Sequence, residues 1–573
     1  MTPGTTRRGL SFLMAVGVAA ATAALFAISR GKWSYAMVDS GREWIVPDAL
    51  AHGDLLYRDV VYWFGPFTPY FHAAWFALLG SGFRTLVLAG VFGSALALGT
   101  LHLALRQVTG RAEAWLWAFL AIPALVFMPD AGGAILGMGY RMWHAAAFGL
   151  AGIAVAARTG KPAVAGLLCA LAGLCRTEWG LASLAAAGLA LVARGASRSR
   201  RPRPRDLLWL ATSFAVLFGG VLAAFAAVAG PDALLADGHL LLTGLPPETR
   251  RALLNLSGFH DPGGGLLRML FAAAAWGAVF LAGEIVAAWR QDPDRLRRRL
   301  PALGGALTYL LLYRDYAGTG SMLAFSAAPL VAAAAMGGGL RLRGGRRAAA
   351  LLGFGLAALA LSSRKPFNIG DSKYVAPPLL FGFVCAAALL WEAVRGQRIR
   401  AVRLRLRAGA RVALVLLTAI AFLARARQYA ADPRVRLAET DGMLSALPAE
   451  AGGLREIVHR VRAATAREQT LVVVPEGELL NYLTGRRNPA RYKLYVPGYL
   501  TDANELAVVS ELERTSPDAI LVLDRPTPEY GRRDFGRDYG RRLARWIEAR
   551  YAPASVGEGA ETTRGVRLWI RRP

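Results

Sequence analysis

The stretch from Leu10 to Ile28, LSFLMAVGVAAATAALFAI, is apolar throughout and follows two arginines, Arg7 and Arg8. Charge followed by an apolar run with small residues is also the pattern of a cleaved signal peptide. This run, however, is nearly as long as the roughly 17 to 25 residues that cross a bilayer. The later segments also need this helix for a consistent topology, so we expect a retained transmembrane helix at residues 10–29.

Apolar stretches recur along the chain as far as Leu423. Of the 573 residues, 55% are hydrophobic, and the mean hydropathy of +0.35 is high for a soluble globular protein. The sequence therefore predicts an α-helical polytopic membrane protein with about thirteen transmembrane helices. The other predicted spans are 84–105, 112–128, 142–157, 162–175, 178–193, 207–229, 266–288, 301–313, 320–339, 348–362, 374–394 and 409–424.

The formal net charge is +28. A nucleic-acid-binding protein would gather such charge on one face or tail, but here it falls mostly in short clusters between apolar segments, where it can orient helices and contact membrane lipids. With a cytoplasmic N-terminus, the densest clusters are cytoplasmic, as the positive-inside rule requires. An odd number of spans then places everything after Arg425 outside. The clusters are 106–111, 158–161, 194–205, 290–299, 341–347 and 395–411.

The chain divides into a membrane body, residues 1–424, and a C-terminal part, residues 425–573. In the C-terminal part, the runs 470–474 (TLVVV), 519–523 (AILVL) and 566–570 (VRLWI) alternate with helix-like segments, which predicts an extracytoplasmic α/β domain. Two outer loops, 30–83 and 230–265, are long. Residues 69–79 in the first loop are aromatic but too few to span, so we expect a helix in the membrane interface.

The first outer loop concentrates the residue types that sugar chemistry uses. Asp39 and Glu43 lie in MVDSGREW, and Arg58 and Asp59 lie in GDLLYRDVVYWFGPFTPY. A lone carboxylate in such a loop is most often a solvated residue. This loop adds an arginine and several aromatic residues, so it can accept a proton, hold a phosphate and stack on a sugar ring. The aromatic residues are Tyr57, Tyr62, Trp63 and Phe64.

These residues resemble the first loop of the GT-C superfamily of lipid-linked-sugar transferases, which includes protein O-mannosyltransferases, aminoarabinose transferases and the RgtA/B/C/D-like proteins. In that superfamily an acidic residue follows the first transmembrane helix, and G-x-x-x-Y-R-D and G-P come later. Here Asp39 is followed by residues 53–59 (GDLLYRD) and by Gly65 and Pro66. Where the family often has an adjacent Asp-Glu pair, Ser40 follows Asp39. The start of the C-terminal domain, residues 473–477 (VVPEG), is also similar.

The resemblance implies an inverting transfer, which needs a base to take a proton from the acceptor hydroxyl. We predict Asp39 as this base, with Glu43 and Asp59 as further catalytic residues. The donor phosphate needs cationic groups, a task that suits the bidentate guanidinium of arginine. Each such cation could instead anchor a helix at the interface. Predicted phosphate ligands are Arg58, Arg141, Arg176, Arg314 and Lys373, and predicted sugar or acceptor contacts are Tyr57, Tyr62, Trp63 and Glu178.

The sequence predicts no specific cofactor. Some GT-C relatives use a divalent ion, and the acids of the first loop are compatible with one, but they have no fixed ligand spacing. The three cysteines lie in apolar segments without metal-type spacing, and no HxxxH or HExxH pair is present.

We therefore predict an integral-membrane inverting glycosyltransferase of the inner (plasma) membrane. Its donor would be a polyprenyl-phosphate-linked sugar, and its acceptor an extracytoplasmic lipid-linked glycan, glycolipid or protein. The alternatives are a transporter or flippase of lipid-linked glycans, and a polymerase of surface polysaccharide. A transporter should show internal repeats and ionisable groups at mid-membrane depth, whereas the polar clusters here lie at the predicted outer rim.

Overall fold

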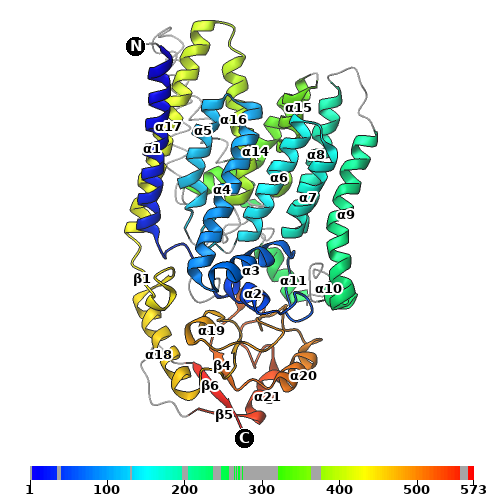
Figure 1. The fold of residues 1–573 in the computed structure, drawn as a ribbon, viewed down its shortest axis with the longest axis vertical. Coiled ribbons are helices and arrows are strands. Elements are labelled where there is room, and N and C mark those ends of the chain that lie inside the picture. Colours follow the sequence, from blue (N-terminus) through cyan, green and yellow to red (C-terminus); the bar gives the residue numbers. More distant parts are fainter. Residues whose placement is uncertain are drawn as a thin grey trace.

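The computed structural model describes most of the chain. The described residues are 3–34, 40–129, 132–137, 139–196, 204–236, 247–256, 263, 264, 266, 267, 269, 270, 274, 320–342, 344–362, 376–554 and 565–572. Most of them are helical, and the long helices lie side by side in one bundle (Figure 1).

The bundle consists of apolar helices. In lipid no water can bind the backbone N–H and C=O groups, and a helix satisfies them with its own hydrogen bonds. The long helices of the described residues are α1 (Pro3–Ser29), α4 (Phe83–Val108), α5 (Arg111–Ala121), α6 (Tyr140–Arg158), α7 (Pro162–Cys175), α8 (Thr177–Ala196), α9 (Pro204–Ala229), α14 (Gly320–Arg341), α15 (Arg346–Ser362), α16 (Ala376–Arg395) and α17 (Arg400–Ala430). A short π-helical turn, η2 (Ile122–Val126), continues α5. Neighbouring helices approach closely through small residues: in α8, Ala186 and Ala190 pack against Gly353 of α15.

Within the described residues, five helices are long and apolar enough to cross a membrane, namely α4, α8, α9, α16 and α17. Every predicted span except two corresponds to one of the bundle helices. The two exceptions, 266–288 and 301–313, lie largely or wholly outside the described residues. The chain is thus a membrane protein built on a helical bundle.

Among the described connections, those between α4 and α5, α6 and α7, α14 and α15, and α16 and α17 lie at one end of the bundle, the end where the N-terminus lies (Figure 1). There Arg407 Nε and Arg411 Nη2 of α17 lie 3.0 and 2.6 Å from the buried Glu113 Oε1 of α5. The first loop and the C-terminal part lie at the opposite end. Basic residues in the short connections at one end of a bundle are the pattern that the positive-inside rule describes.

The first loop contains two helices that lie across the end of the bundle, α2 (Gly41–Ala51) and α3 (Phe67–Leu79) (Figure 1). The interfacial helix predicted at 69–79 corresponds to α3. Two further helices of this end are α10 (Pro231–Ala236) and α11 (Pro247–Leu256), which lie in the second long loop.

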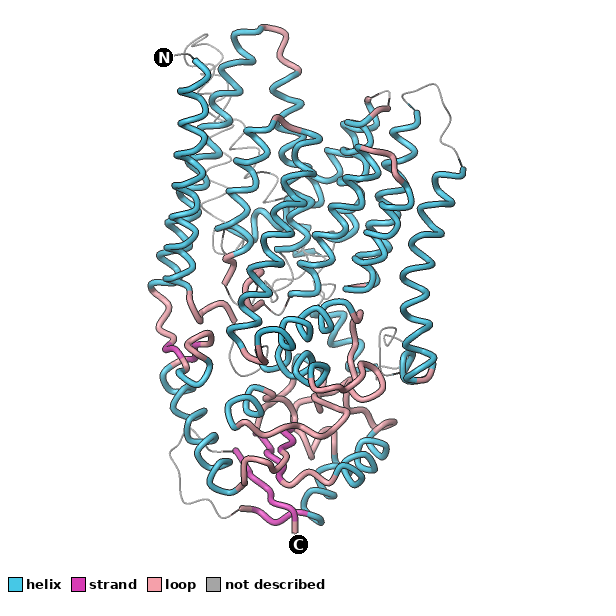
Figure 2. Tube along the Cα trace, viewed as in Figure 1, coloured by secondary structure: helices cyan, strands magenta, loops and turns pink. Residues whose placement is uncertain are grey.

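After α17 the chain forms a small sheet covered by helices (Figure 2). Its strands, in the spatial order β3-β4-β6-β5, are β3 (Leu471–Val474), β4 (Ala519–Leu523), β6 (Val566–Arg571) and β5 (Tyr551–Pro553). The pair β3 and β4 is parallel, with Val472 opposite Ile520, and the other pairs are antiparallel. Both β3 and β4 are buried along their whole length, as expected for parallel strands covered on both faces.

Other elements of this part cover the sheet or join it to the bundle. They are β1 (Val435–Arg436), the 3₁₀ turn η6 (Ala438–Thr440), β2 (Ser445–Ala446), α18 (Pro448–Ala464), α19 (Leu479–Thr484), α20 (Glu505–Thr515), the 3₁₀ turn η7 (Pro528–Tyr530) and α21 (Arg541–Arg550). The loop between β3 and α19, which carries residues 475–478, faces α2. The C-terminal part therefore lies directly on the first loop.

Candidate active site

The N-terminus of α2 lies against the C-terminal part. A Cβ atom at Gly41 would stand 2.2 Å from the backbone nitrogen of Leu479, so only glycine allows this approach. Ser40, which precedes the helix, is buried, and its hydroxyl lies 3.0 Å from Ser34 Oγ. Asp39, the predicted base, lies outside the described residues, although the chain on its C-terminal side enters this buried junction.

Glu43, in the first turn of α2, forms a buried ion pair with Arg141 in the first turn of α6. Arg141 Nη1 donates to Glu43 Oε1 at 2.9 Å, and the side chains are only 4% and 6% exposed. The same Nη1 lies 3.5 Å from the hydroxyl of Tyr62. Two opposite charges tolerate such burial only as a pair. Burial also raises the pKa of Tyr62 to about 12, so its hydroxyl remains a neutral hydrogen-bonding group.

The ring of Phe64 lies close to two guanidinium groups. The Cζ atoms of Arg141 and Arg176 lie 4.0 and 5.2 Å from the centre of its ring, which is within range of a cation–π interaction. The chain reaches Arg176 because Gly65 packs on the end of α7: a Cβ there would stand 1.9 Å from the carbonyl oxygen of Leu174. The glycine of the G-P motif thus holds the first loop against the α7–α8 corner.

Arg176 and Glu178 flank the corner between α7 and α8. Arg176 Nη2 lies 2.6 Å from Glu178 Oε1, with Arg176 mostly buried and Glu178 half exposed. Among the described residues, Arg176 Nε is buried without a hydrogen-bond partner. This donor is available to an acceptor that the protein itself does not supply.

A second charged group, absent from the predicted set, joins α2 to the C-terminal part. Arg42 Nη2 donates to Glu476 Oε2 at 2.6 Å, and Arg525 Nη1 lies 2.6 Å from Glu476 Oε1. Glu478 is also buried here, and burial raises its pKa to about 8. In the sequence, Arg42 could have been noticed because it lies between Asp39 and Glu43. Glu476 could have been noticed because it lies in the segment 473–477 (VVPEG). No local pattern connects two residues so distant in sequence.

The aromatic residues of the loop have structural partners. Trp63 stacks on Tyr499 of the C-terminal part, with ring centres 4.0 Å apart and planes 4° from parallel. Tyr57 is fully buried, and its hydroxyl donates to the carbonyl oxygen of Phe64 at 2.6 Å. Tyr57 has φ +68°, a left-handed conformation that is unusual for a bulky residue. The hydrogen bond of Tyr57 therefore fixes the backbone of the segment that contains Trp63 and Phe64.

Arg58 and Asp59 form a pair within their own turn. Arg58 Nη2 donates to Asp59 Oδ2 at 2.7 Å, and the backbone nitrogen of Leu55 donates to the same oxygen at 2.8 Å. The hydrogen bond from Arg58 holds the pKa of Asp59 below its usual value. Arg491 of the C-terminal part donates to the carbonyl oxygens of Tyr57 and Arg58 at 2.8 and 2.9 Å.

The predicted ligands Arg314 and Lys373 lie outside the described residues, as Asp39 does. Within the part of the chain that the structure describes, no three side chains of His, Cys, Asp or Glu gather as a metal site would require. A cavity of about 10 Å³ lies beside Glu43 and holds at most one water molecule.

The structure thus brings together Glu43, Tyr62, Arg141, Arg176 and Glu178 at the end of the bundle opposite the N-terminus. Guanidinium groups held this way can bind a phosphate with paired hydrogen bonds. Both arginine side chains are largely buried, which strengthens their electrostatic interaction with an anion.

The chain has the overall fold of a solved membrane glycosyltransferase, so the resemblance first seen in the loop extends to the fold of the whole chain. The structure is similar to the crystal structure of ArnT from Cupriavidus metallidurans in the apo state, with a TM-score of 0.53, 13% sequence identity and 98% of each chain covered. It also resembles, with a TM-score of 0.47 and 13% identity, the archaeal oligosaccharyltransferase AglB from Archaeoglobus fulgidus in complex with an inhibitory peptide and a dolichol-phosphate. That match covers 97% of this chain and 74% of the other. No protein-family model and no curated protein matches the sequence.

Proposed function

We propose that the chain is an integral-membrane inverting glycosyltransferase that moves a sugar from a polyprenyl-phosphate donor to an extracytoplasmic acceptor. The acceptor is a lipid-linked glycan, a glycolipid or a protein. The observation that carries this proposal is the buried Glu43–Arg141 pair beside Arg176 at the rim of a GT-C bundle. Such a site offers positive charge where the headgroup of a membrane lipid would lie.

The donor phosphate binds to Arg141 and Arg176 in this proposal. Arg176 is the better placed of the two, because its Nε is buried without a partner among the described residues. Glu43 positions Arg141 by holding Nη1 at 2.9 Å. Phe64 and Tyr62 line the site on the side of the first loop. The sequence also predicts Arg58, Arg314 and Lys373 as phosphate ligands.

The transfer step uses Asp39 as general base. The acceptor oxygen forms a bond to the anomeric carbon while the bond from that carbon to the phosphate oxygen breaks. The proton of the acceptor hydroxyl passes to Asp39, and the electron pair of the broken bond stays on the lipid phosphate. Arg141 and Arg176 stabilise the charge that develops there, as preorganised cations do in other transferases.

The topology that we propose has about thirteen spans, a cytoplasmic N-terminus and an extracytoplasmic domain of residues 425–573 in the inner (plasma) membrane. The gathering of basic connections at the N-terminal end of the bundle supports this orientation. A reporter fused after Pro573 tests it, because the fusion must respond to an extracytoplasmic probe. A cytoplasmic signal would place the proposed site on the wrong side.

The function is tested with the purified protein in proteoliposomes and a panel of polyprenyl-phospho-sugars, each with a set of glycolipid, lipid-linked glycan and peptide acceptors. We expect one donor to yield a glycosylated acceptor and free polyprenyl phosphate. Arg176→Gln should raise the KM for that donor, while Arg487→Gln, an exposed arginine at the same end, should leave it unchanged. Transbilayer movement of an intact donor without sugar transfer would favour the flippase alternative, and no use of any donor would contradict the proposal.

A further inference from the structure

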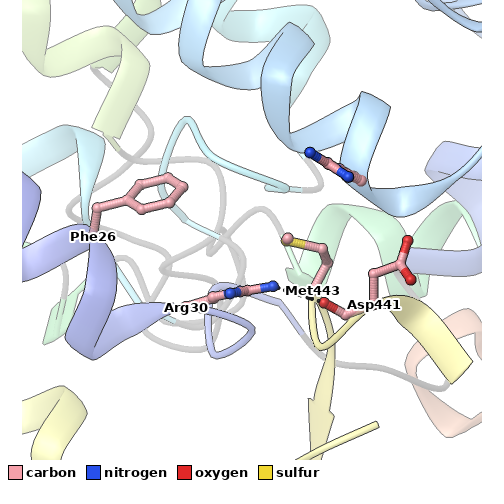
Figure 3. A pocket seen from close by; sticks show the side chains of 5 residues that line it. Phe26, Arg30, Asp441 and Met443 are labelled. Carbon is pink, nitrogen blue, oxygen red and sulfur yellow. Dashed lines mark hydrogen bonds between the residues drawn. The ribbon is translucent and has the colours of Figure 1, made fainter. Parts of the chain in front are cut away.

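A second cavity lies at the end of the bundle that carries the first loop, between the end of α1 and the start of α4. Its volume is about 520 Å³, and it is open to the outside. The residues that line it are Phe26, Arg30, Arg84, Asp441 and Met443, which we call the α1–α4 pocket (Figure 3). None of them lines the small cavity beside Glu43, so the two cavities are separate.

The α1–α4 pocket carries charges of both signs. Arg30 Nη2 donates to the backbone oxygen of Asp441 at 2.9 Å, and Figure 3 shows its side chain reaching from α1 to the turn of Asp441 and Met443. The Nε of Arg30 is buried without a partner among the described residues. Arg84 is exposed, and within the described part of the chain the Asp441 carboxylate forms no ion pair with either guanidinium. The pocket thus presents two cations and one separate anion.

The remaining wall of the pocket is apolar. Phe26 lies in the last turn of α1, and Met443 is largely buried beside it. Both α1 and α4 are apolar helices, and the pocket lies where they leave the bundle. This is the level at which lipid headgroups meet a membrane protein. A ligand with a charged head and an apolar tail fits these surroundings.

We propose that the α1–α4 pocket binds the phosphoethanolamine headgroup of a membrane phospholipid. The phosphate lies between Arg30 and Arg84, the ammonium group donates to the Asp441 carboxylate, and the start of an acyl chain packs on Phe26 and Met443. A headgroup without an amine leaves the Asp441 carboxylate without a cationic partner, and a choline headgroup has no N–H to donate. This lipid site goes beyond the proposed sugar transfer and does not depend on it.

The test uses the full-length protein, purified in detergent and stripped of lipid, with short-chain phospholipids as probes. Native mass spectrometry measures how much of each lipid is retained. We expect phosphatidylethanolamine to be retained above both phosphatidylcholine and phosphatidylglycerol. Arg84→Gln should weaken retention of phosphatidylethanolamine about tenfold, the effect of losing one charge-assisted hydrogen bond. Asp441→Asn should remove the preference for ethanolamine over glycerol.

Both substitutions fall on exposed side chains, so the fold should persist, and gel filtration with thermal unfolding checks this. Arg467→Gln, an exposed arginine outside the pocket, is the matched control and should retain the wild-type preference. Equal retention of all three lipids, or no effect of Arg84→Gln and Asp441→Asn, would overturn the proposal. Displacement of the bound lipid by polyprenyl phosphate would also overturn it, and equally tight binding of free phosphoethanolamine would refute the role of the acyl chain.

Discussion

Removal of Arg141 tests whether the centre of the proposed site is a buried ion pair. Arg141→Met keeps most of the side-chain volume but removes the guanidinium that lies 2.9 Å from the Glu43 carboxylate. The Glu43 side chain is only 6% exposed. Removing one member of a buried pair typically costs about 3 to 5 kcal/mol, because the other charge stays buried without it. The contact of the guanidinium with Phe64, 4.0 Å from the ring centre, is lost as well. We therefore expect a loss near the upper end of that range.

The free energy of unfolding of the detergent-solubilised protein is measured for the wild type and for three variants. The double variant Glu43→Gln/Arg141→Met should recover much of the loss, since no isolated charge remains buried. Arg58→Met is the matched control: it breaks an ion pair of similar length, 2.7 Å, whose members are 51% and 34% exposed. Solvent screens that pair, so we expect little change. A loss for Arg141→Met no greater than for Arg58→Met would refute the buried pair.

Two further predictions concern the packing of the first loop and the charge on Glu478. Gly65→Ala should separate the loop from α7, because its Cβ would stand 1.9 Å from the Leu174 oxygen. A displacement of about 1 Å can lower turnover about a hundredfold. Gly82→Ala, whose Cβ would lie 3.6 Å from its nearest neighbour, is the control in the same transfer assay. For Glu478, burial raises the folded-state pKa to about 8, so between the ordinary carboxyl pKa and pH 8 the folded protein holds more protons than the unfolded one. Stability should therefore fall as pH rises through this window and be flat above it. Glu478→Gln should abolish the decline in thermal unfolding temperature between pH 5 and 9, and an unchanged decline would show that Glu478 is not its cause.

The bundle could be predicted from sequence because lipid imposes its own length and polarity on each segment. The apolar run predicted at 207–229 is α9 (Pro204–Ala229), and the run at 84–105 is α4 (Phe83–Val108). In each case polar or basic residues mark the ends. α17 is longer than its predicted span of 409–424, because an arginine-rich segment that begins at Arg400 continues the same helix beyond the apolar stretch.

The candidate site could be predicted only in part. Glu43, Tyr62, Arg141 and Arg176 were identified one by one as chemically suited side chains, but their partners depend on tertiary contacts. Glu43 and Arg141 are 98 residues apart, and Arg42 and Glu476 are 434 apart. Neither periodicity nor motif spacing can reveal a contact between residues so far apart in the sequence.

For the first-loop motif, the pattern could be recognised from the sequence but the contacts of its residues could not. Residues 53–59 were recognised as a pattern, yet the pattern does not say whether its arginine and acid face a substrate or each other. In the structure Arg58 donates to Asp59, and the turn is held by Arg491 of the C-terminal part. Docking between two distant segments decided the local environment of the motif.

The most direct measurement of the central proposal compares Asp39→Asn with Asp54→Asn in transfer from the active polyprenyl-phospho-sugar. Both changes remove one carboxylate from the same loop, and Asp54 pairs only with the exposed Arg487 among the ion pairs of the described residues. If Asp39 is the base, Asp39→Asn should lower kcat by about 10² to 10⁴-fold with little change in the KM for the donor, while Asp54→Asn should keep turnover within a few-fold. Full activity of Asp39→Asn, in a protein that still folds and binds the donor, would contradict the proposed chemistry.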